Sequence, residues 1–277
     1  MSREAEKVTP KYVGPIPGAP VDYRYLLGMR VDATTYADAA RRIVDRSSSD
    51  AGGYVCAASA HMVMEALDSE NFRSAVNGAA LVTADGMPLV WSLRMLGVRG
   101  ASRVYGPRLM EEVLGAAERA QTPVGLYGGT PEVLAKLQDT CRGRFPLLRI
   151  AYAWAPPFRP LTPDEERKVI GDINRSGARI LFVGIGCPKQ EYWMARNQES
   201  LASVAIGVGA AFDFLAGVKK QAPPWMQRLG LEWLFRLMTE PRRLWRRYLK
   251  TVPRFALFMS YRLITGRDIA RASSRPA

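Results

Sequence analysis

Histidine and cysteine are scarce in this 277-residue chain, and their scarcity excludes several kinds of site. The chain has one histidine, His61, and three cysteines that lie far apart, with no CxxC pair and no histidine cluster. Neither a zinc site nor a disulfide framework is therefore expected. A Ser-His-Asp triad would depend on that single histidine. The cysteines are interpreted as free thiols in a reducing compartment.

Long apolar runs are missing as well. No stretch of about 18 uncharged apolar residues occurs, which argues against a transmembrane helix. The N-terminus is rich in Pro and Gly and has no apolar region of the kind found in a signal peptide. We therefore interpret residues 1–22 as a flexible lead-in and expect the body of the protein to lie in the cytoplasm.

Three nucleotide-binding signatures are also absent. The chain contains no strict GxGxxG, no P-loop and no Asp-x-Asp on a loop after a strand. A dehydrogenase, an NTPase and a metal-dependent sugar-nucleotide site all lack their usual signatures. The sequence predicts neither a cofactor nor a metal.

Charge is abundant but unevenly distributed. Residues 219–277 hold 14 Lys/Arg and three Asp/Glu, a net charge of +11, whereas the whole chain carries +13. The protein is thus a nearly neutral body with a strongly basic tail, and the partner of that tail is expected to be anionic.

Short apolar runs alternate with helical patterns from about residue 24 onward. The alternation predicts βαβ units and a Rossmann-like α/β fold over residues 23–218, with a mainly parallel sheet and helices on both faces. The expected strands are Tyr25–Val31, Tyr54–Ala58, Ala80–Thr83, Val124–Tyr127, Leu148–Tyr152, Ile180–Val183 and Val204–Val208. The expected helices lie near 35–47, 60–68, 87–96, 107–120, 131–142, 162–176 and 188–197.

Two strand-to-helix junctions are rich in glycine. Gly128 and Gly129 precede one predicted helix, and Gly184 and Gly186 precede another, each with a proline at the expected helix start. Glycine lets backbone N–H groups approach a ligand, and a helix N-terminus favours phosphate. The alternative is that these glycines only permit tight turns.

Asp85 and Arg103 follow the strand at Ala80–Thr83 and stand before successive helices. A carboxylate at the carboxyl end of a strand is well placed as a general base, although Asp85 could instead cap the helix near Met87. Arg103 could bind a phosphate or diphosphate, or it could be an ordinary surface arginine.

Polar residues near two other helix starts are further candidates. Gln190 could point its amide at sugar hydroxyls and Lys189 could offset phosphate charge, or both could form an ordinary polar first turn. His61 could contact a ligand in the crevice or serve as a polar group at a helix start.

The tail interleaves aromatic and basic residues at helical spacing. Leu244, Trp245, Tyr248 and Leu249 predict one apolar stripe, with arginines on the other side. Such a helix is typical of anionic membrane surfaces. Packing of the stripe on the body or on a second subunit, and binding of nucleic acid, are the competing interpretations. We interpret residues 219–265 as a helical membrane-association appendage, called the appendage below, and residues 266–277 as a flexible tail.

Several motifs together resemble the WecG/TagA/CpsF glycosyltransferases, in that family's order and spacing over about residues 25–265. They are Ala84-Asp85-Gly86, Arg103-Val104-Tyr105-Gly106, Tyr127-Gly128-Gly129, Gly184-Ile185-Gly186-Cys187-Pro188-Lys189-Gln190-Glu191, Gly209-Ala210-Ala211-Phe212-Asp213-Phe214-Leu215-Ala216-Gly217, Ala222-Pro223-Pro224-Trp225-Met226, Gly230-Leu231-Glu232-Trp233-Leu234-Phe235-Arg236 and Glu240-Pro241-Arg242-Arg243-Leu244-Trp245-Arg246-Arg247-Tyr248.

The resemblance implies an inverting enzyme of glycosyltransferase family 26 that requires no metal. Such enzymes move a sugar, typically N-acetylmannosamine, from its UDP derivative to an undecaprenyl-diphosphate-linked sugar at the cytoplasmic membrane face. The expected partners are therefore a UDP-sugar, the polyprenyl-diphosphate-linked acceptor and an anionic membrane surface, with no nucleic acid. A second copy of the chain, in a homo-oligomer, is a further candidate partner. A nucleic-acid-binding protein with a basic tail is the alternative function.

The resemblance also implies roles for particular residues. Asp85 corresponds to the family's proposed catalytic base, Arg103 to its substrate-contacting arginine, and Gln190 to the glutamine of its Pro-Lys-Gln-Glu motif. The arginines that engage the lipid-linked diphosphate would fall among Arg236, Arg243, Arg246 and Arg247.

The chain departs from the family pattern in two places, one of them after the Arg-x-x-Gly motif, where Pro107-Arg108 stands in place of the family's common Asp two positions on. Where the family has a Thr-x-Asn-x-Glu stretch, this chain has Ala57, Ser59 and His61. Ser59 and His61 thus join the candidate substrate-binding residues, and the identity of the transferred hexose stays open.

Overall fold

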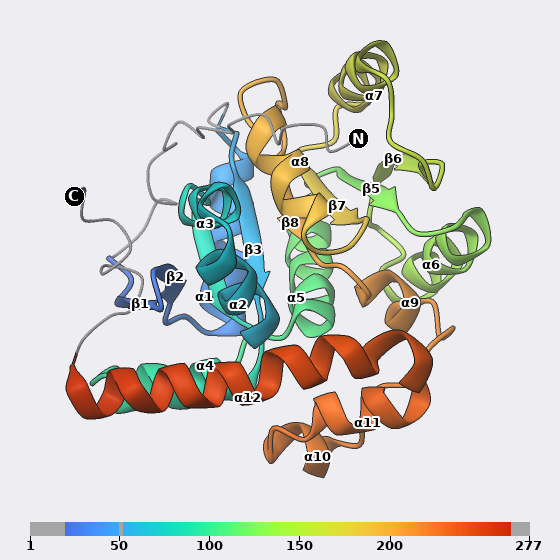
Figure 1. The fold of residues 1–277 in the computed structure, drawn as a ribbon. Coiled ribbons are helices and arrows are strands. Elements are labelled where there is room, and N and C mark those ends of the chain that lie inside the picture. Colours follow the sequence, from blue (N-terminus) through green and yellow to red (C-terminus); the bar gives the residue numbers. More distant parts are fainter. Residues whose placement is uncertain (1–19, 50–51, 267–277) are drawn as a thin grey trace.

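The computed structural model describes residues 20–49 and 52–266, and an eight-stranded sheet runs through it (Figure 1). The strands are β1 (Tyr23–Leu26), β2 (Met29–Asp32), β3 (Tyr54–Ala58), β4 (Leu81–Ala84), β5 (Val124–Gly128), β6 (Ile150–Trp154), β7 (Ile180–Gly184) and β8 (Val204–Gly207). They lie in the order β1-β2-β4-β3-β8-β7-β5-β6, and only β1 and β2 are antiparallel. The predicted Rossmann-like, mainly parallel sheet is confirmed. Nearly all of the predicted lead-in, and the tail from residue 267, lie outside the described residues.

Helices cover both faces of the sheet, as expected. One core contains buried side chains of α2 (Ala60–Asp68), α3 (Glu70–Asn77), α4 (Met87–Met95), α7 (Pro163–Ser176) and α8 (Lys189–Asn197). The other contains those of α1 (Tyr36–Ser47), α5 (Gly106–Arg119), α6 (Pro131–Arg144) and α9 (Ala211–Leu215). The central strands are apolar on both faces because both are covered.

The prediction of a single strand over Tyr25–Val31 is wrong. The segment forms a hairpin, in which Leu26 of β1 pairs with Met29 of β2. The two turn residues, Leu27 and Gly28, have φ values of 50° and 86°. A turn with positive φ at both central positions matches the twist of paired strands, and leucine at the first position conceals it in the sequence.

Two helices were not predicted. Glu70–Asn77 forms α3 directly after α2, and the hydroxyl of Ser69 caps it by accepting a hydrogen bond from the N–H of Phe72 (3.2 Å). Ala211–Leu215 forms the short helix α9. Both are short, so each offers little periodicity in the sequence.

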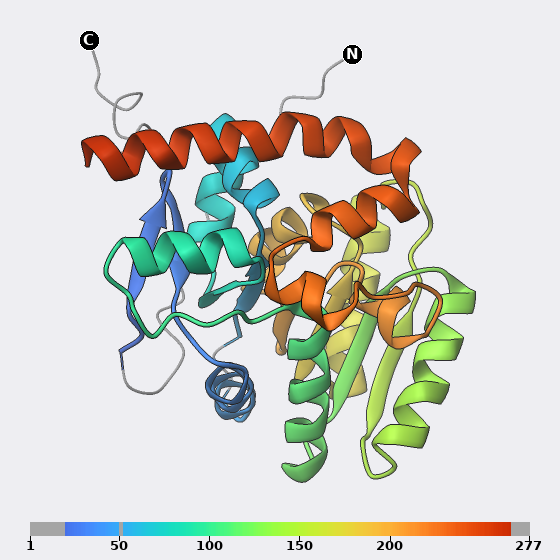
Figure 2. The same cartoon turned by 90° about the horizontal axis from the view of Figure 1, so that it is seen from below.

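The appendage contains three helices, α10 (Pro224–Arg228), α11 (Glu232–Thr239) and α12 (Pro241–Thr265). The long helix α12 runs along one side of the body, beside α2 and α4 (Figure 2). Gly230, between α10 and α11, sits tightly against α4. A Cβ at this position would lie 2.8 Å from Cη2 of Trp91, and the φ of Gly230 is +69°. The appendage therefore meets the body at a point where any side chain would be strained and would require the indole of Trp91 to shift.

The single apolar stripe predicted for the tail is divided in the structure. Leu244 is buried, whereas Trp245 is 47% exposed and Leu249 is 72% exposed. Further along α12, Phe255 and Met259 are buried in the core beside α2 and α4. The helix thus packs one apolar face on the body and leaves a second one uncovered. Part of α12 therefore packs on the body, as one of the competing interpretations expected, and association with a membrane stays a prediction.

Candidate active site

Asp85 lies at the carboxyl end of β4, where the chain leaves the sheet. Its N–H donates to the carbonyl oxygen of Ala58 at the end of β3 (2.9 Å). Its Oδ2 accepts a hydrogen bond from the N–H of Gly106, the first residue of α5 (3.0 Å). The carboxylate thus faces the positive end of α5. The alternative that Asp85 caps α4 is wrong, because Gly86 holds that position and no side chain caps the helix.

The environment of Asp85 brings its ionisation close to neutral pH. Burial raises the pKa of Asp85 to about 6; nearby Arg103 lowers it, and nearby Glu232 raises it. The side chain still keeps 22% of its surface exposed, so it can reach a bound molecule. A carboxylate with a pKa near the working pH has the property that a general base needs.

Arg103 is held beside Asp85 by groups from the body and from the appendage. Its Nε donates to the backbone carbonyl of Asp85 (2.6 Å), and its guanidinium lies 4.3 Å from the centre of the Tyr105 ring. Its Nη1 donates to Oε1 of Gln227 in α10 (3.2 Å), and its Nη2 pairs with the carboxylate of Glu232 in α11. Arg103 is therefore not an ordinary surface arginine.

Glu232 joins two arginines. Besides its pair with Arg103, its Oε1 lies 3.3 Å from Nε of Arg236, one helical turn further along α11. Arg236 in turn lies over the ring of Phe214, at 5.2 Å from the ring centre. The side chain of Glu232 is 15% exposed. This ion-pair network links the catalytic candidate on the body to the appendage.

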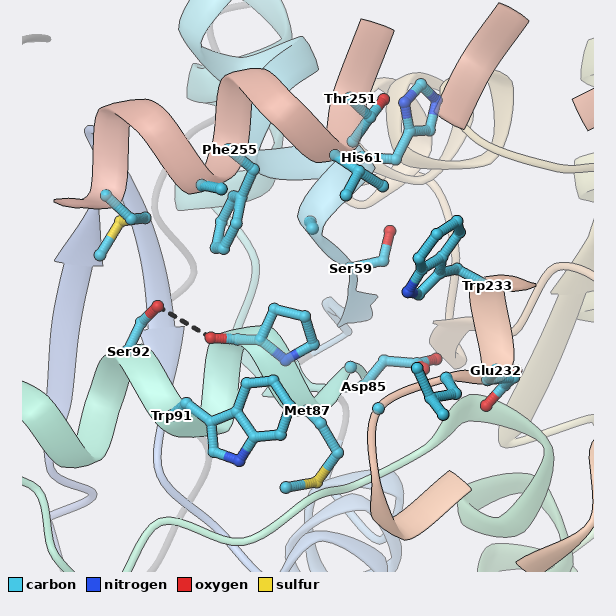
Figure 3. A pocket seen from close by; sticks show the side chains of 18 of the residues that line it. Ser59, His61, Asp85, Met87, Trp91, Ser92, Glu232, Trp233, Thr251 and Phe255 are labelled. Atoms are coloured by element: carbon cyan, nitrogen blue, oxygen red, sulfur yellow. Dashed lines mark hydrogen bonds between the residues drawn. The ribbon is translucent and has the colours of Figure 1, made fainter. Parts of the chain in front are cut away.

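These groups line one end of a cavity of about 540 Å³ between the body and the appendage (Figure 3). The body supplies residues from the start of α2, from Asp85 onward into α4, and Arg103. The appendage supplies residues of α10, α11 and α12. Ser59, Asp85 and Trp233 lie near one another in the close-up (Figure 3). The site is thus built from two parts of the chain that are far apart in the sequence.

The other end of the cavity is apolar. It extends between α4 and α12, where the figure shows the side chains of Trp91 and Phe255 on opposite walls (Figure 3). Met95, Met259 and Leu263 also line the cavity. A charged end and an apolar end within one cavity suit a ligand that has both characters.

His61 and Arg247 are further polar residues that line the cavity. Burial, together with the nearby positive charges of Arg247 and Lys250, lowers the pKa of His61 to about 4, so the imidazole is neutral at pH 7. Ser59 stands at the N-cap of α2 without making a capping hydrogen bond, and it lines the cavity. Hydrogen-bonding groups on these side chains are thus available to a ligand.

Residues 24–268 of the chain match the family model described as "Glycosyl transferase WecG/TagA/CpsF family". This chain belongs to that family. The resemblance seen in the motifs is confirmed over nearly the same residues. The family consists of glycosyltransferases that act on polyprenyl-linked sugars in the synthesis of cell-surface polymers, with sugar-nucleotide donors.

The four candidate arginines of this glycosyltransferase divide into two pairs. Arg236 and Arg247 line the cavity. Arg243 pairs instead with Glu240 on its own helix, and Arg246 lies over the ring of Trp245, 5.2 Å from its centre. Among the described residues, no hydrogen bond or ion pair engages the guanidinium of Arg247, but its charge is close enough to lower the pKa values of His61 and Glu191.

The two glycine-rich junctions of this glycosyltransferase lie outside the cavity that contains Asp85. Gly128 and Gly184 end the neighbouring strands β5 and β7, and a Cβ on Gly128 would lie 2.5 Å from the carbonyl carbon of Gly184. Gly128, Gly129 and Gly186 all have positive φ and do not line the cavity that contains Asp85. The tight-turn interpretation therefore has direct geometric support at Gly128, and a role in phosphate binding stays a prediction.

Gln190 and Lys189, at the start of α8, also lie outside that cavity. Gln190 is buried; its Nε2 donates to Oε1 of Glu191 (2.8 Å) and its Oε1 accepts from the N–H of Gly209 (3.1 Å). Lys189 is exposed. A sugar bound only in the cavity of Asp85 would therefore not touch Gln190. The predicted contact between Gln190 and a sugar stays a prediction.

Sequence reasoning assigned no role to Glu232 or Gln227, which hold Arg103 in the structure. The Gly-Leu-Glu-Trp run around Glu232 was part of the family motif, but its place beside Arg103 depends on how the appendage docks. The one sequence feature that could have singled out Glu232 is its position as an acidic residue in a strongly basic tail.

Residues 20–49 and 52–266 contain neither a membrane-spanning helix nor a group of side chains suited to a metal ion. None of the helices there has both the length and the apolar character needed to cross a membrane. The same residues contain no group of three or more His, Cys, Asp or Glu side chains placed to hold a metal ion. The predicted absence of a metal requirement stays a prediction.

Proposed function

We propose that this glycosyltransferase moves a hexose, N-acetylmannosamine or another, from a UDP-sugar to an undecaprenyl-diphosphate-linked sugar with inversion at the anomeric carbon. The observation that carries the proposal is the cavity between body and appendage, which joins an ionisable carboxylate and arginines at one end to an apolar channel at the other. A sugar diphosphate attached to a polyprenyl chain has the same division into an anionic head and an apolar tail.

Asp85 is the proposed general base. The acceptor hydroxyl gives its proton to the carboxylate of Asp85 as its oxygen attacks the anomeric carbon from the face opposite to UDP. The bond from that carbon to the UDP oxygen breaks, and UDP leaves with the electron pair, so the configuration inverts. The raised pKa of about 6 leaves Asp85 mostly ionised at pH 7 and basic enough to accept a proton.

Arginines at the charged end are proposed to stabilise diphosphate groups. Arg103 lies beside Asp85, which suits contact with the reacting sugar or its leaving group. Arg236 and Arg247 are the proposed contacts of the lipid-linked diphosphate, since they line the cavity and Arg243 and Arg246 do not. Guanidinium groups match phosphate oxygens in geometry as well as in charge.

The apolar end is proposed to receive the first isoprene units of the acceptor. The cavity is lined there by Trp91 and Met95 of α4 and by Phe255, Met259 and Leu263 of α12. Burial of isoprene carbon there would contribute about 25 cal/mol per Å² of apolar surface. Because both ends belong to one cavity, the diphosphate and the chain can be held at the same time.

The exposed apolar residues of the appendage support action at the inner face of the cell membrane, with the protein bound peripherally. Trp225, Leu229, Trp245, Leu249 and Leu257 are between 47% and 72% exposed, and basic residues lie among them. This combination suits the headgroup region of an anionic bilayer. Nucleic-acid binding, the alternative function, is supported by no further feature of the described residues.

The test is turnover of a panel of UDP-sugars with a polyprenyl-diphosphate-sugar acceptor, using the full chain and its Asp85→Asn variant. Asp139→Asn, on the exposed face of α6 with its side chain 74% exposed, is the matched control. Sugar transfer by the wild type and the control, with transfer by Asp85→Asn slower by about 100-fold or more, supports the proposal. Failure of the wild type to use any UDP-sugar would refute it.

A further inference from the structure

The carboxylate of Glu232 occupies the space between two guanidinium groups that come from different parts of the chain. Arg103 belongs to the loop before α5, and Arg236 belongs to α11. Both ion pairs line the cavity rather than the outer surface, and Glu232 itself is only 15% exposed. Its position is thus that of an anion bound by two arginines inside a ligand cavity.

This arrangement leaves little net charge beside Asp85. When both carboxylates are ionised, Asp85 and Glu232 balance the charges of Arg103 and Arg236. A diphosphate that entered between the two arginines would lie close to the carboxylate of Glu232, and two like charges at that distance in a partly buried site repel strongly. Glu232 and a diphosphate therefore cannot occupy this position together without a large cost.

Exchange between the two anions is chemically straightforward. A guanidinium presents the same fork of N–H donors to a carboxylate and to a phosphate. Removing the anion would leave two partly buried guanidinium groups without their partner, which is unfavourable, but replacing it with another anion keeps both satisfied. An internal carboxylate also holds the two arginines in the geometry that the incoming ligand needs.

We infer that Glu232 is an internal substitute for a diphosphate, which holds Arg103 and Arg236 in place in the unliganded enzyme and is displaced when the diphosphate of a substrate binds between them. The inference rests on the proposed function, in which both substrates carry a diphosphate. Glu232 acts here through the two arginines and is a positioning residue. It competes with the ligand for them, so its removal strengthens binding of a diphosphate.

The test is calorimetric titration of the full chain with inorganic pyrophosphate, which needs no sugar transfer and so is independent of the proposed reaction. Glu232→Gln, which keeps an amide oxygen for the arginines but removes the competing charge, is expected to bind pyrophosphate about tenfold more tightly. The gain should shrink in high salt. Glu240→Gln, which removes another appendage carboxylate that bridges two cations outside the cavity, should bind like the wild type. Unchanged or weaker binding by Glu232→Gln overturns the inference.

A second readout separates competition for the arginines from a merely structural role. The charges that face Asp85 are Arg103, Glu232 and Arg236, and Glu232 raises the pKa of Asp85. In Glu232→Gln the acid limb of the pH profile should therefore move below the wild-type value of about 6. A structure of the wild type bound to pyrophosphate tests the same point without a substitution, because it shows whether Arg103 and Glu232 remain paired. Pyrophosphate bound with the pair between Arg103 and Glu232 broken supports the inference, and an intact pair overturns it.

Two further ligands identify the source of the diphosphate. Titration with UDP and with farnesyl diphosphate compares the nucleotide donor with the lipid-linked acceptor. A gain in affinity of Glu232→Gln for UDP assigns the position to the donor, and a gain for farnesyl diphosphate assigns it to the acceptor. A gain for neither ligand contradicts the inference.

Discussion

Arg254 on α12 donates two hydrogen bonds to the carboxylate of Asp68 at the end of α2, one from Nη1 (2.8 Å) and one from Nη2 (2.6 Å). Lys250 adds a second cation 3.5 Å from the same carboxylate. The pair joins the appendage to the body through residues that do not line the cavity. The contribution of this ion pair to the docking of the appendage can be measured separately from catalysis.

We expect Arg254→Gln to loosen the appendage slightly. Both side chains are about one-third exposed, and exposed ion pairs contribute about 0.5 kcal/mol, so local opening should rise about twofold. Limited proteolysis between body and appendage measures this opening. Arg243→Gln, which removes a pair within the appendage, is the control. Equal cleavage rates for the two variants would show that the ion pair between Arg254 and Asp68 contributes nothing.

Asp85→Asn is expected to lower kcat by about 100-fold or more, because a positioned base contributes roughly that factor. The amide can still accept the hydrogen bond from Gly106, so the fold around α5 should persist and the melting temperature should change little. Steady-state rates with a UDP-sugar and a lipid-linked acceptor check the prediction. A folded Asp85→Asn variant with wild-type turnover would remove Asp85 from the role of base.

The pH dependence of kcat/KM is expected to show an acid limb with an apparent pKa of about 6, the value to which burial raises the pKa of Asp85. The base works only when ionised, so the rate should fall tenfold per unit below this pH and level off above it. His61, with a pKa of about 4, stays neutral across this range. A limb near pH 4 would mean that Asp85 is not perturbed as described, or is not the base.

Two adjacent arginines provide a matched comparison for acceptor binding. Arg247→Gln should raise KM for a short, water-soluble acceptor analogue about tenfold, because a charge-assisted hydrogen bond contributes about 1.5 kcal/mol. Arg246→Gln should leave this KM within about twofold, since Arg246 lies over Trp245 and away from the cavity. A soluble analogue removes the contribution of the membrane. Equal effects would refute the division of the arginines.

The exposed apolar face of α12 predicts binding to anionic vesicles. Leu249→Ser should weaken partitioning onto phosphatidylglycerol vesicles about fivefold, because a leucine that inserts into the interface contributes roughly 1–2 kcal/mol. Leu147→Ser is a close control, since both leucines are 72% exposed and Leu147 follows α6, outside the appendage. Equal partitioning of the two variants would exclude α12 as the surface that meets the membrane.

Features that depend on short segments of sequence were the most predictable. The alternation of buried strands and helices revealed the fold class, and Asp85 could be singled out because it follows the strand ending at Ala84. The hairpin of β1 and β2 was missed because Leu27, a residue not favoured at positive φ, occupies its turn. Local pattern predicts an element well when the residues conform to the usual preferences of that element.

Features that depend on docking between distant segments were not predictable. Glu232 lies more than a hundred residues from Arg103, and nothing in their spacing reveals that they meet. The apolar stripe on α12 was seen, but its periodicity alone does not tell which side chains face the body. That Trp245 is exposed and Leu244 buried follows from how α12 lies along the body, which is a tertiary property.

The tight fit of Gly230 against Trp91 has a consequence for exchanging parts between members of this family. Any side chain at position 230 would collide with the indole, whose Cη2 would lie 2.8 Å from a new Cβ. A chimera that carries a relative's appendage on this body must therefore keep a glycine there, or bring the matching α4 with it. The natural unit of exchange is α4 together with α10–α12, although more than a hundred residues of the chain separate the two segments.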